Sequence, residues 1–236
     1  FFTRAADGSI QQTKPLLSVT AIRSMALDTT GRRFVAARLN RTIQLIERGR
    51  KTPLLTIPLK GVKEIKAVRF ADGDRRLIAV ASARRGTGEN EDWLLAWDAQ
   101  SGAFAQGITN RHTLVALAVT PDGSRVAVGG GNKEIAVYDG HDLKPLLRFR
   151  AHDALITALA FHPTRPVIAS CSEDFSVKVW NYETGQLLDT FLGPTRRPGA
   201  LSFSASGRLL ACNSADNITR IWKLDAAGLI SAADVR

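Results

Sequence analysis

A seven-residue pattern recurs along the chain, beginning with Asp, Asn or Glu and usually ending in an aromatic or aliphatic residue. It is found as DFSVKVW (174–180), DNITRIW (216–222), NKEIAVY (132–138), NRTIQLI (40–46), EDWLLAW (91–97) and, more weakly, DGSIQQT (7–13). These anchors begin at positions 7, 40, 91, 132, 174 and 216, with separations of 33, 51, 41, 42 and 42. A period near 42 indicates repeated units, each of which must bury its faces against its neighbours.

The sequence around each anchor predicts four short strands per unit. Before every anchor except the first, an alternating run leads into a turn, and a second apolar run follows, as in AFHPTR and PVIASCS. After the anchor come a polar turn and a fourth run, as in NYETGQLLDTFL. Gly, Asp, Pro and Asn at the junctions are the residues that tight turns favour.

This pattern resembles the WD40 repeat, and the resemblance implies a β-propeller. It covers essentially the whole chain and is strongest over 151–192, good over 113–150 and 199–224, and degraded over 20–60. The Trp-Asp pair that names the family is kept once, as Trp97-Asp98. Elsewhere the two positions read Tyr138-Asp139, Trp180-Asn181, Trp222-Lys223 and Ile46-Glu47.

The expected fold is all-β: a WD40-type β-propeller with five full four-stranded blades and a partial N-terminal blade. A single domain, 1–236, divides into the partial blade 1–19 and the blades 20–60, 61–112, 113–150, 151–192 and 193–236. The opening segment is expected to supply the second to fourth strands of its blade, and the tail 226–236 the last blade's fourth strand. Because the sequence begins at Phe1, we interpret it as a fragment of a seven-bladed ring. Closure of six blades is the alternative.

The family resemblance implies a hydrogen-bonded set of His, Ser, Asp and Trp within one blade. In this sequence the matching residues are His152, Ser170, Asp174 and Trp180, with Ser172 as a substitute for Ser170. A buried indole needs an acceptor and a buried carboxylate needs donors, so the imidazole is expected to connect them. Two other units keep only parts of this set, namely His112, Asn132 and Tyr138 in the third and Asp216 with Trp222 in the fifth.

The charge is concentrated in one half of the chain. The net charge is +10 overall, and residues 1–90 carry 18 Lys and Arg against 7 Asp and Glu. Such a basic half suits an acidic partner or nucleic acid, although charged loops also keep a surface soluble. Cys171 and Cys212 are expected on opposite strand faces, as two separate buried thiols, which favours a reducing, cytoplasmic location. The Ala- and Arg-rich composition suggests a bacterial source.

Motifs of known enzyme chemistry are not found. The sequence contains no GxSxG, HExxH, GxxxxGK[ST] or EF-hand pattern, and GGGN at 129–132 is not followed by a helix pattern that could bind phosphate. No apolar run approaches the length of a membrane span. We therefore expect no catalytic residue, no cofactor, no metal and no membrane insertion.

The function expected from the resemblance is a non-catalytic scaffold that binds a protein or peptide, part of a larger chain. Loop residues on one face are the candidates for partner binding, and their charge predicts an acidic partner. They are Arg23, Lys63, Arg111, Leu155 and Arg197, extended by Arg84 and Arg85 on a nine- to ten-residue insertion in the second unit. The alternative is nucleic-acid association through a basic cluster in one blade: Arg32, Arg33, Arg38, Arg41, Arg48, Arg50 and Lys51. A propeller enzyme is a third possibility, which the sequence favours least.

Overall fold

All regular structure in the described part of this chain is β-strand. The computed structural model describes residues 2–4, 10–12, 21–84, 90–224 and 230–232. Within these ranges the strands form five four-stranded antiparallel sheets and one two-stranded sheet. Each four-stranded sheet takes its strands in chain order, which is the meander of a propeller blade. The predicted all-β class, with blades of WD40 type, is confirmed. No helix in the described ranges is long and apolar enough to span a bilayer.

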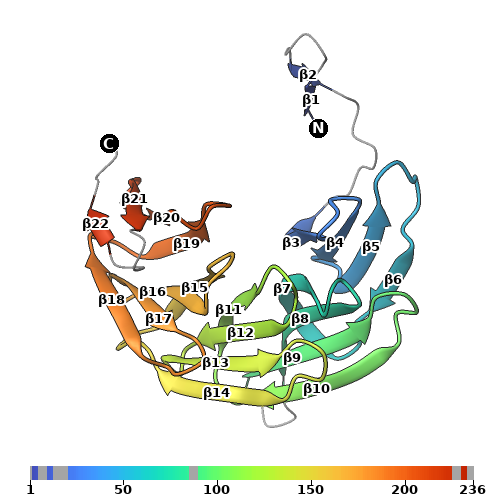
Figure 1. The fold of residues 1–236 in the computed structure, drawn as a ribbon. Helices are drawn as coiled ribbons and strands as arrows, with labels where there is room; N and C mark the ends of the chain where they lie inside the picture. The colour runs from blue at the N-terminus through green and yellow to red at the C-terminus, as the bar shows by residue number, and fades with distance from the viewer. Residues whose placement is uncertain (1, 5–9, 13–20, 85–89, 225–229, 233–236) are drawn as a thin grey trace.

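The five blades are arranged as an arc, with the first strand of each blade on the inside and the fourth on the outside (Figure 1). Neighbouring first strands pack side by side around the inner wall. The first strands are β3 (Ile22–Leu27), β7 (Val62–Ala71), β11 (Leu114–Val119), β15 (Ile156–Phe161) and β19 (Pro198–Phe203). The fourth strands are β6 (Leu55–Pro58), β10 (Phe104–Asn110), β14 (Pro145–Arg150), β18 (Leu187–Leu192) and β22 (Ile230–Ala232).

The second and third strands of a blade form a hairpin around the anchor residue. Val167 pairs with Asn181, and Leu209 with Lys223, so these hairpins are centred on Asp174 and Asp216. The residue that follows the anchor has positive φ in four blades, at Arg41, Lys133, Phe175 and Asn217. The second strands are β4 (Arg33–Arg38), β8 (Arg76–Arg84), β12 (Arg125–Gly130), β16 (Val167–Ser172) and β20 (Leu209–Ser214). The third strands are β5 (Thr42–Glu47), β9 (Asn90–Asp98), β13 (Glu134–Asp139), β17 (Ser176–Asn181) and β21 (Thr219–Leu224).

The second blade departs from this geometry because its insertion lengthens the hairpin. Its strands β8 and β9 remain paired out to Arg84 and Asn90. The anchor Glu91 consequently lies inside β9 rather than in a turn. The predicted binding loop falls partly on 85–89. This range includes Arg85 and lies outside the described residues.

The N-terminal segment forms a hairpin with the same register as the others. Strands β1 (Phe2–Arg4) and β2 (Ile10–Gln12) pair Phe2 with Gln12 and Arg4 with Ile10, so the hairpin is centred on position 7. The second and third strands of every regular blade pair in this way around their anchor. The expected fourth strand of this partial blade falls on 13–20, outside the described residues.

The hydrophobic core is divided into four clusters, one between each pair of neighbouring blades. The aromatic residue that ends each anchor heptad packs toward the preceding blade. Trp180, for example, lies in the same cluster as Ile135 and Val137 of the third blade. Trp97, Tyr138 and Trp222 hold the corresponding places in the other three clusters. The near-constant repeat spacing therefore places one large side chain at each blade interface.

The prediction of two buried thiols is confirmed, because Cys171 and Cys212 are both free and buried, but they do not lie apart. Both are buried, and both lie in the cluster between the fourth and fifth blades. Their one-residue offset does place them on opposite faces of their sheets. Radially stacked sheets turn opposite faces toward each other, however, so the offset brings the two thiols to the same interface. Hydrogen bonding between them raises the pKa of Cys212.

Candidate functional site

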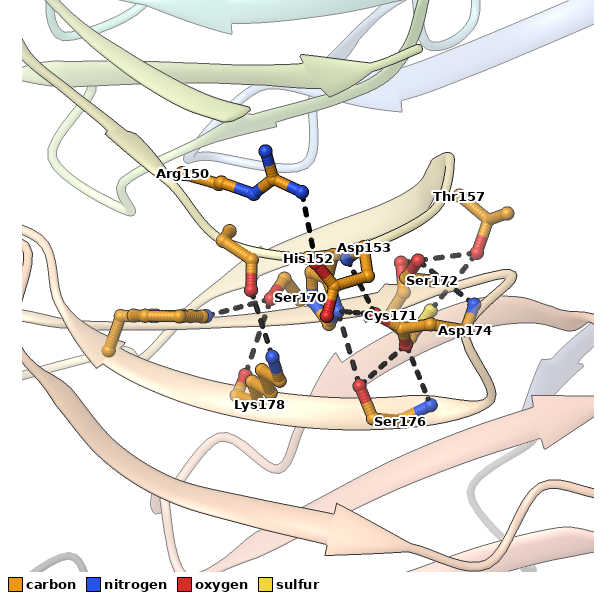
Figure 2. Close-up of polar contacts among 12 residues, drawn as sticks. Arg150, His152, Asp153, Thr157, Ser170, Cys171, Ser172, Asp174, Ser176 and Lys178 are labelled. Carbon is orange, nitrogen blue, oxygen red and sulfur yellow. Dashed lines mark hydrogen bonds and ion pairs between the residues drawn. The ribbon is translucent and has the colours of Figure 1, made fainter. Parts of the chain in front are cut away.

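The four residues of the expected hydrogen-bonded set meet inside the fourth blade. His152 lies between the fourth strand of the third blade and β15, Ser170 lies on β16, Asp174 in the following turn, and Trp180 on β17. His152 Nδ1 is 2.8 Å from Asp174 Oδ2, and His152 Nε2 is 2.7 Å from Ser170 Oγ. The Trp180 indole N–H donates to Ser170 Oγ at 2.9 Å. Figure 2 shows His152 between Ser170 and Asp174.

One assignment of protons satisfies every member of this set. Trp180 donates to Ser170, Ser170 donates to His152 Nε2, and His152 donates from Nδ1 to Asp174. His152 and Ser170 are both almost fully buried, so any unpaired polar atom among them would cost stability. A neutral imidazole is required, and burial does lower the pKa of His152.

Asp174 is the most heavily bonded member of the set. It also accepts from the Ser176 hydroxyl at 2.6 Å, from the Ser176 N–H at 3.0 Å and from the Asp153 N–H at 3.1 Å. Although burial opposes its ionisation, these hydrogen bonds and the nearby His152 lower its pKa to about 2. Ser172, the proposed substitute for Ser170, instead accepts the Asp174 N–H at 3.2 Å. The set therefore joins the anchor turn and strands β16 and β17 to the connection that precedes β15.

We expect the free energy of unfolding to fall as the pH is lowered. The pKa of His152 is depressed in the folded state, so its contribution is full above about 6.5 and is lost as the pH falls below that value. The Asp174 contribution is full above about 4 and is lost as the pH falls toward 2. Urea unfolding at about pH 7.5 and about pH 5.5 measures the histidine part. His162, whose pKa is also lowered by burial, contributes in the same window. Replacing His152 by Gln should therefore reduce the pH dependence without abolishing it, and an unchanged dependence would contradict the assignment.

The incomplete sets in other blades do not form the same arrangement. His112 is exposed, and its backbone N–H donates to Asn110 Oδ1, so it does not join Asn132. The connection from His112 to the next strand is two residues shorter than the one from His152. The His112 ring therefore does not reach the anchor turn of its blade. In the fifth blade Asp216 accepts from the N–H and hydroxyl of Thr195, each at 3.0 Å, and from Arg220 Nη1 at 2.9 Å. The main chain and an arginine thus replace the missing histidine.

A buried set in the second blade was not predicted. Asp92 is only 2% exposed and accepts from the Ser82 hydroxyl, from Lys66 Nζ and from the Leu114 N–H. Leu114 begins the first strand of the third blade, so Asp92 connects two neighbouring blades. The sequence does contain a signal for this buried set, the triplet EDW at 91–93. Its first residue, Glu91, fits the anchor position, and the buried carboxylate is its neighbour Asp92.

The predicted partner-binding residues are brought to one face, where the strand 4-to-1 connections lie, but they differ in their contacts. Lys63 and Arg111 are exposed, and neither forms an ion pair with another described residue. Arg23 pairs with Glu64 and Arg197 with Glu173, each at 3.0 Å. Leu155 is half-buried, and its carbonyl accepts the Glu173 N–H. The side chains of Arg84 and Arg85 lie outside the described structure.

The basic cluster proposed for nucleic acid is divided between the two ends of the first blade. Arg38 and Arg41 flank the turn between β4 and β5, whereas the other five members lie at the opposite end. Two of those five also have acidic partners, because Arg33 pairs with Asp28 and Arg50 with Glu47. Among the described residues, no group of three His, Cys, Asp or Glu side chains is placed to hold a metal ion.

Comparison with known proteins identifies the class. The model of the WD40 family, described as WD domain, G-beta repeat, matches residues 143–181 and 185–223. These two ranges are therefore WD40 repeats, and the described blades follow the four-stranded antiparallel geometry expected for such repeats.

Several curated relatives share parts of the chain. A Lissencephaly-1 homolog of Caenorhabditis briggsae is 44% identical over 59 residues, which is 25% of this chain and 15% of that protein. Nuclear distribution protein PAC1 of Komagataella phaffii is 31% identical over 103 residues, 42% of this chain and 21% of the relative. THO complex subunit 3 of Arabidopsis thaliana is 23% identical over 206 residues, 86% of this chain and 63% of the relative. The first three relatives are matched over only 15% to 21% of their length. These relatives are eukaryotic, so they give no support to the bacterial source suggested by composition.

Proposed function

We propose that this chain is an interaction scaffold that binds an acidic protein segment on the face carrying the strand 4-to-1 connections. The observation that supports this most directly is the exposure of Lys63 and Arg111 on that face without ion pairs among the described residues. Unpaired basic side chains on a rigid surface attract an acidic partner and raise its association rate. Relatives named as complex subunits, such as THO complex subunit 3, are compatible with a binding role.

The ion pairs on this face extend the proposed surface. Arg23 and Glu64 belong to the first and second blades, and Glu173 and Arg197 to the fourth and fifth. All four side chains are partly exposed, so each pair is worth little to stability by itself. Such exposed pairs let the carboxylates of an acidic partner compete with Glu64 and Glu173 for the two arginines.

The charge-reversal variant K63E/R111E tests this proposal. With the chain as bait for affinity capture from its native extract, we expect the double variant to retain less than about a tenth of each specific partner. The matched control is Lys144→Glu, which reverses an exposed charge in the strand 3-to-4 turn on the opposite face. Normal capture by K63E/R111E with loss by K144E would contradict the proposed face. Capture that disappears after nuclease treatment would support the nucleic-acid alternative instead.

A further inference from the structure

One position of the first strand, on the inner wall of the arc, holds a charged side chain in the second blade and a small residue in the next three blades. Arg69 pairs with Ile78, and the equivalent first-strand positions in the next three blades are Ala118, Ala160 and Ser202. Arg69 has no packing role in the repeat, since alanine fills the same place elsewhere. A long cationic side chain at a position that the fold fills with alanine therefore calls for a ligand.

These four residues line one pocket. It encloses about 290 Å³ near the ends of β11, β15 and β19, and Pro121 and Pro163 complete its wall. Among the described residues that line the pocket, Arg69 is the only charged one. The first strands lie on the inner side of the arc in Figure 1, and three of them, β11, β15 and β19, supply most of the lining. The other side chains that line the pocket are apolar, apart from Ser202 and Ser204.

The Arg69 guanidinium has no carboxylate partner within the described structure. Its Nη1 donates to the Val68 carbonyl at 2.8 Å and to Ser24 Oγ at 3.4 Å, both neutral acceptors. Asp28 and Asp74, which line a second pocket together with Arg69, bond instead to Arg33 and to Thr29. Burial lowers the pKa of Arg69, and no opposing charge offsets that effect. Arg69 is partly buried, and a partly buried cation without a counter-charge favours an anion beside it.

We propose that Arg69 anchors a binding site on the inner wall for the carboxylate of a Glu or Asp side chain from a partner protein. A guanidinium fork matches a carboxylate with two parallel hydrogen bonds. One arginine balances one carboxylate, whereas a phosphate group would require more positive charge than this pocket holds. The alanine and proline walls suit the methylene groups and backbone of a peptide.

This site is distinct from the proposed interaction face, because it lies at the end of the first strands where the strand 1-to-2 turns begin. The two surfaces can therefore be tested independently.

The test is an NMR titration of the arginine Nε–H signals of the whole chain. The Arg69 signal is assigned by its loss in Arg69→Ala. N-acetyl-L-glutamic acid α-amide is the probe, and N-acetyl-L-glutamine amide is its uncharged isostere. We expect a saturable shift of the Arg69 signal with the glutamate probe and none with the isostere. Arg69→Lys, followed by the backbone amide signals of Ala118 and Ala160 in the pocket wall, should weaken binding of the probe about tenfold, because it keeps the charge but loses the fork.

Several results would overturn the proposal. They are the absence of a saturable shift, an equal shift with the glutamine isostere, and tighter binding of inorganic phosphate than of the glutamate probe. Arg69→Ala should fold and melt at the same temperature or higher, since alanine occupies the equivalent positions. Unfolding of this variant would assign Arg69 a structural role instead. K63E/R111E should leave the titration unchanged, so failure here is separable from failure of the proposed face.

Discussion

Replacing His152 by Ala should lower the free energy of unfolding by roughly 2–4 kcal/mol. The substitution leaves Ser170 without the acceptor for its hydroxyl proton and removes a donor from Asp174, both in a largely buried setting. Unsatisfied buried groups cost about 1–3 kcal/mol each, and the lost ring volume adds a smaller term. Urea unfolding followed by tryptophan fluorescence measures the change.

The chain offers a matched control in His112. This histidine occupies the corresponding connection one blade earlier, but it is exposed and lies outside any such set. His112→Ala should change stability by less than about 0.5 kcal/mol. Equal effects of the two substitutions would show that the hydrogen-bonded set does not stabilise the fourth blade.

Replacing Gly207 by Ala should be still more damaging, with a loss of roughly 3–5 kcal/mol. Gly207 has a φ of +70°, and an added Cβ would lie 2.2 Å from His162 Nε2. The His162 ring cannot move aside freely, because its Nδ1 accepts the Thr164 and Arg165 N–H groups and its Nε2 donates to the Gly207 carbonyl. Thermal and urea unfolding both measure the loss.

The equivalent glycine of the first blade separates the two causes. Gly31 has a φ of +67°, but nothing lies within 4 Å of its added Cβ. Gly31→Ala should therefore show only the backbone cost of about 1 kcal/mol. Adding His162→Ala to Gly207→Ala should recover part of the loss, and strict additivity of the two substitutions would rule out the clash as its cause.

Much of the fold could be predicted from the sequence because each unit carries similar turn residues and apolar runs at similar spacing. In four of the five blades the anchor marks a tight turn between two strands, and each Trp or Tyr six residues after an anchor marks a buried interface position. The set of His152, Ser170, Asp174 and Trp180 could be named because all its members lie in one unit at family spacing. The distances among them depend on local strand pairing, which that spacing already specifies.

Features that involve two units were predicted poorly. The relation of Cys171 to Cys212 was misjudged because facing surfaces belong to different blades. Asp92 was overlooked because its partner Leu114 lies 22 residues away in the next blade. The ion pairs of Arg23 and Arg197 were likewise missed, since Glu64 and Glu173 come from neighbouring units.

The sequence alone thus determined the unit of this protein: four strands, a turn at each anchor, and the side chains that meet within one blade. Only the tertiary structure decided how units meet. It placed two thiols at one interface, neutralised two of the candidate arginines and left Arg69 unpaired on the inner wall. It also revealed a register shift near the start of every first strand, as between Ile156 and Ala158. The physical reason is the sequence separation of the residues in contact. Contacts within a blade follow from strand periodicity over a few residues. Contacts between blades depend instead on sheet twist and stacking, which no local pattern encodes.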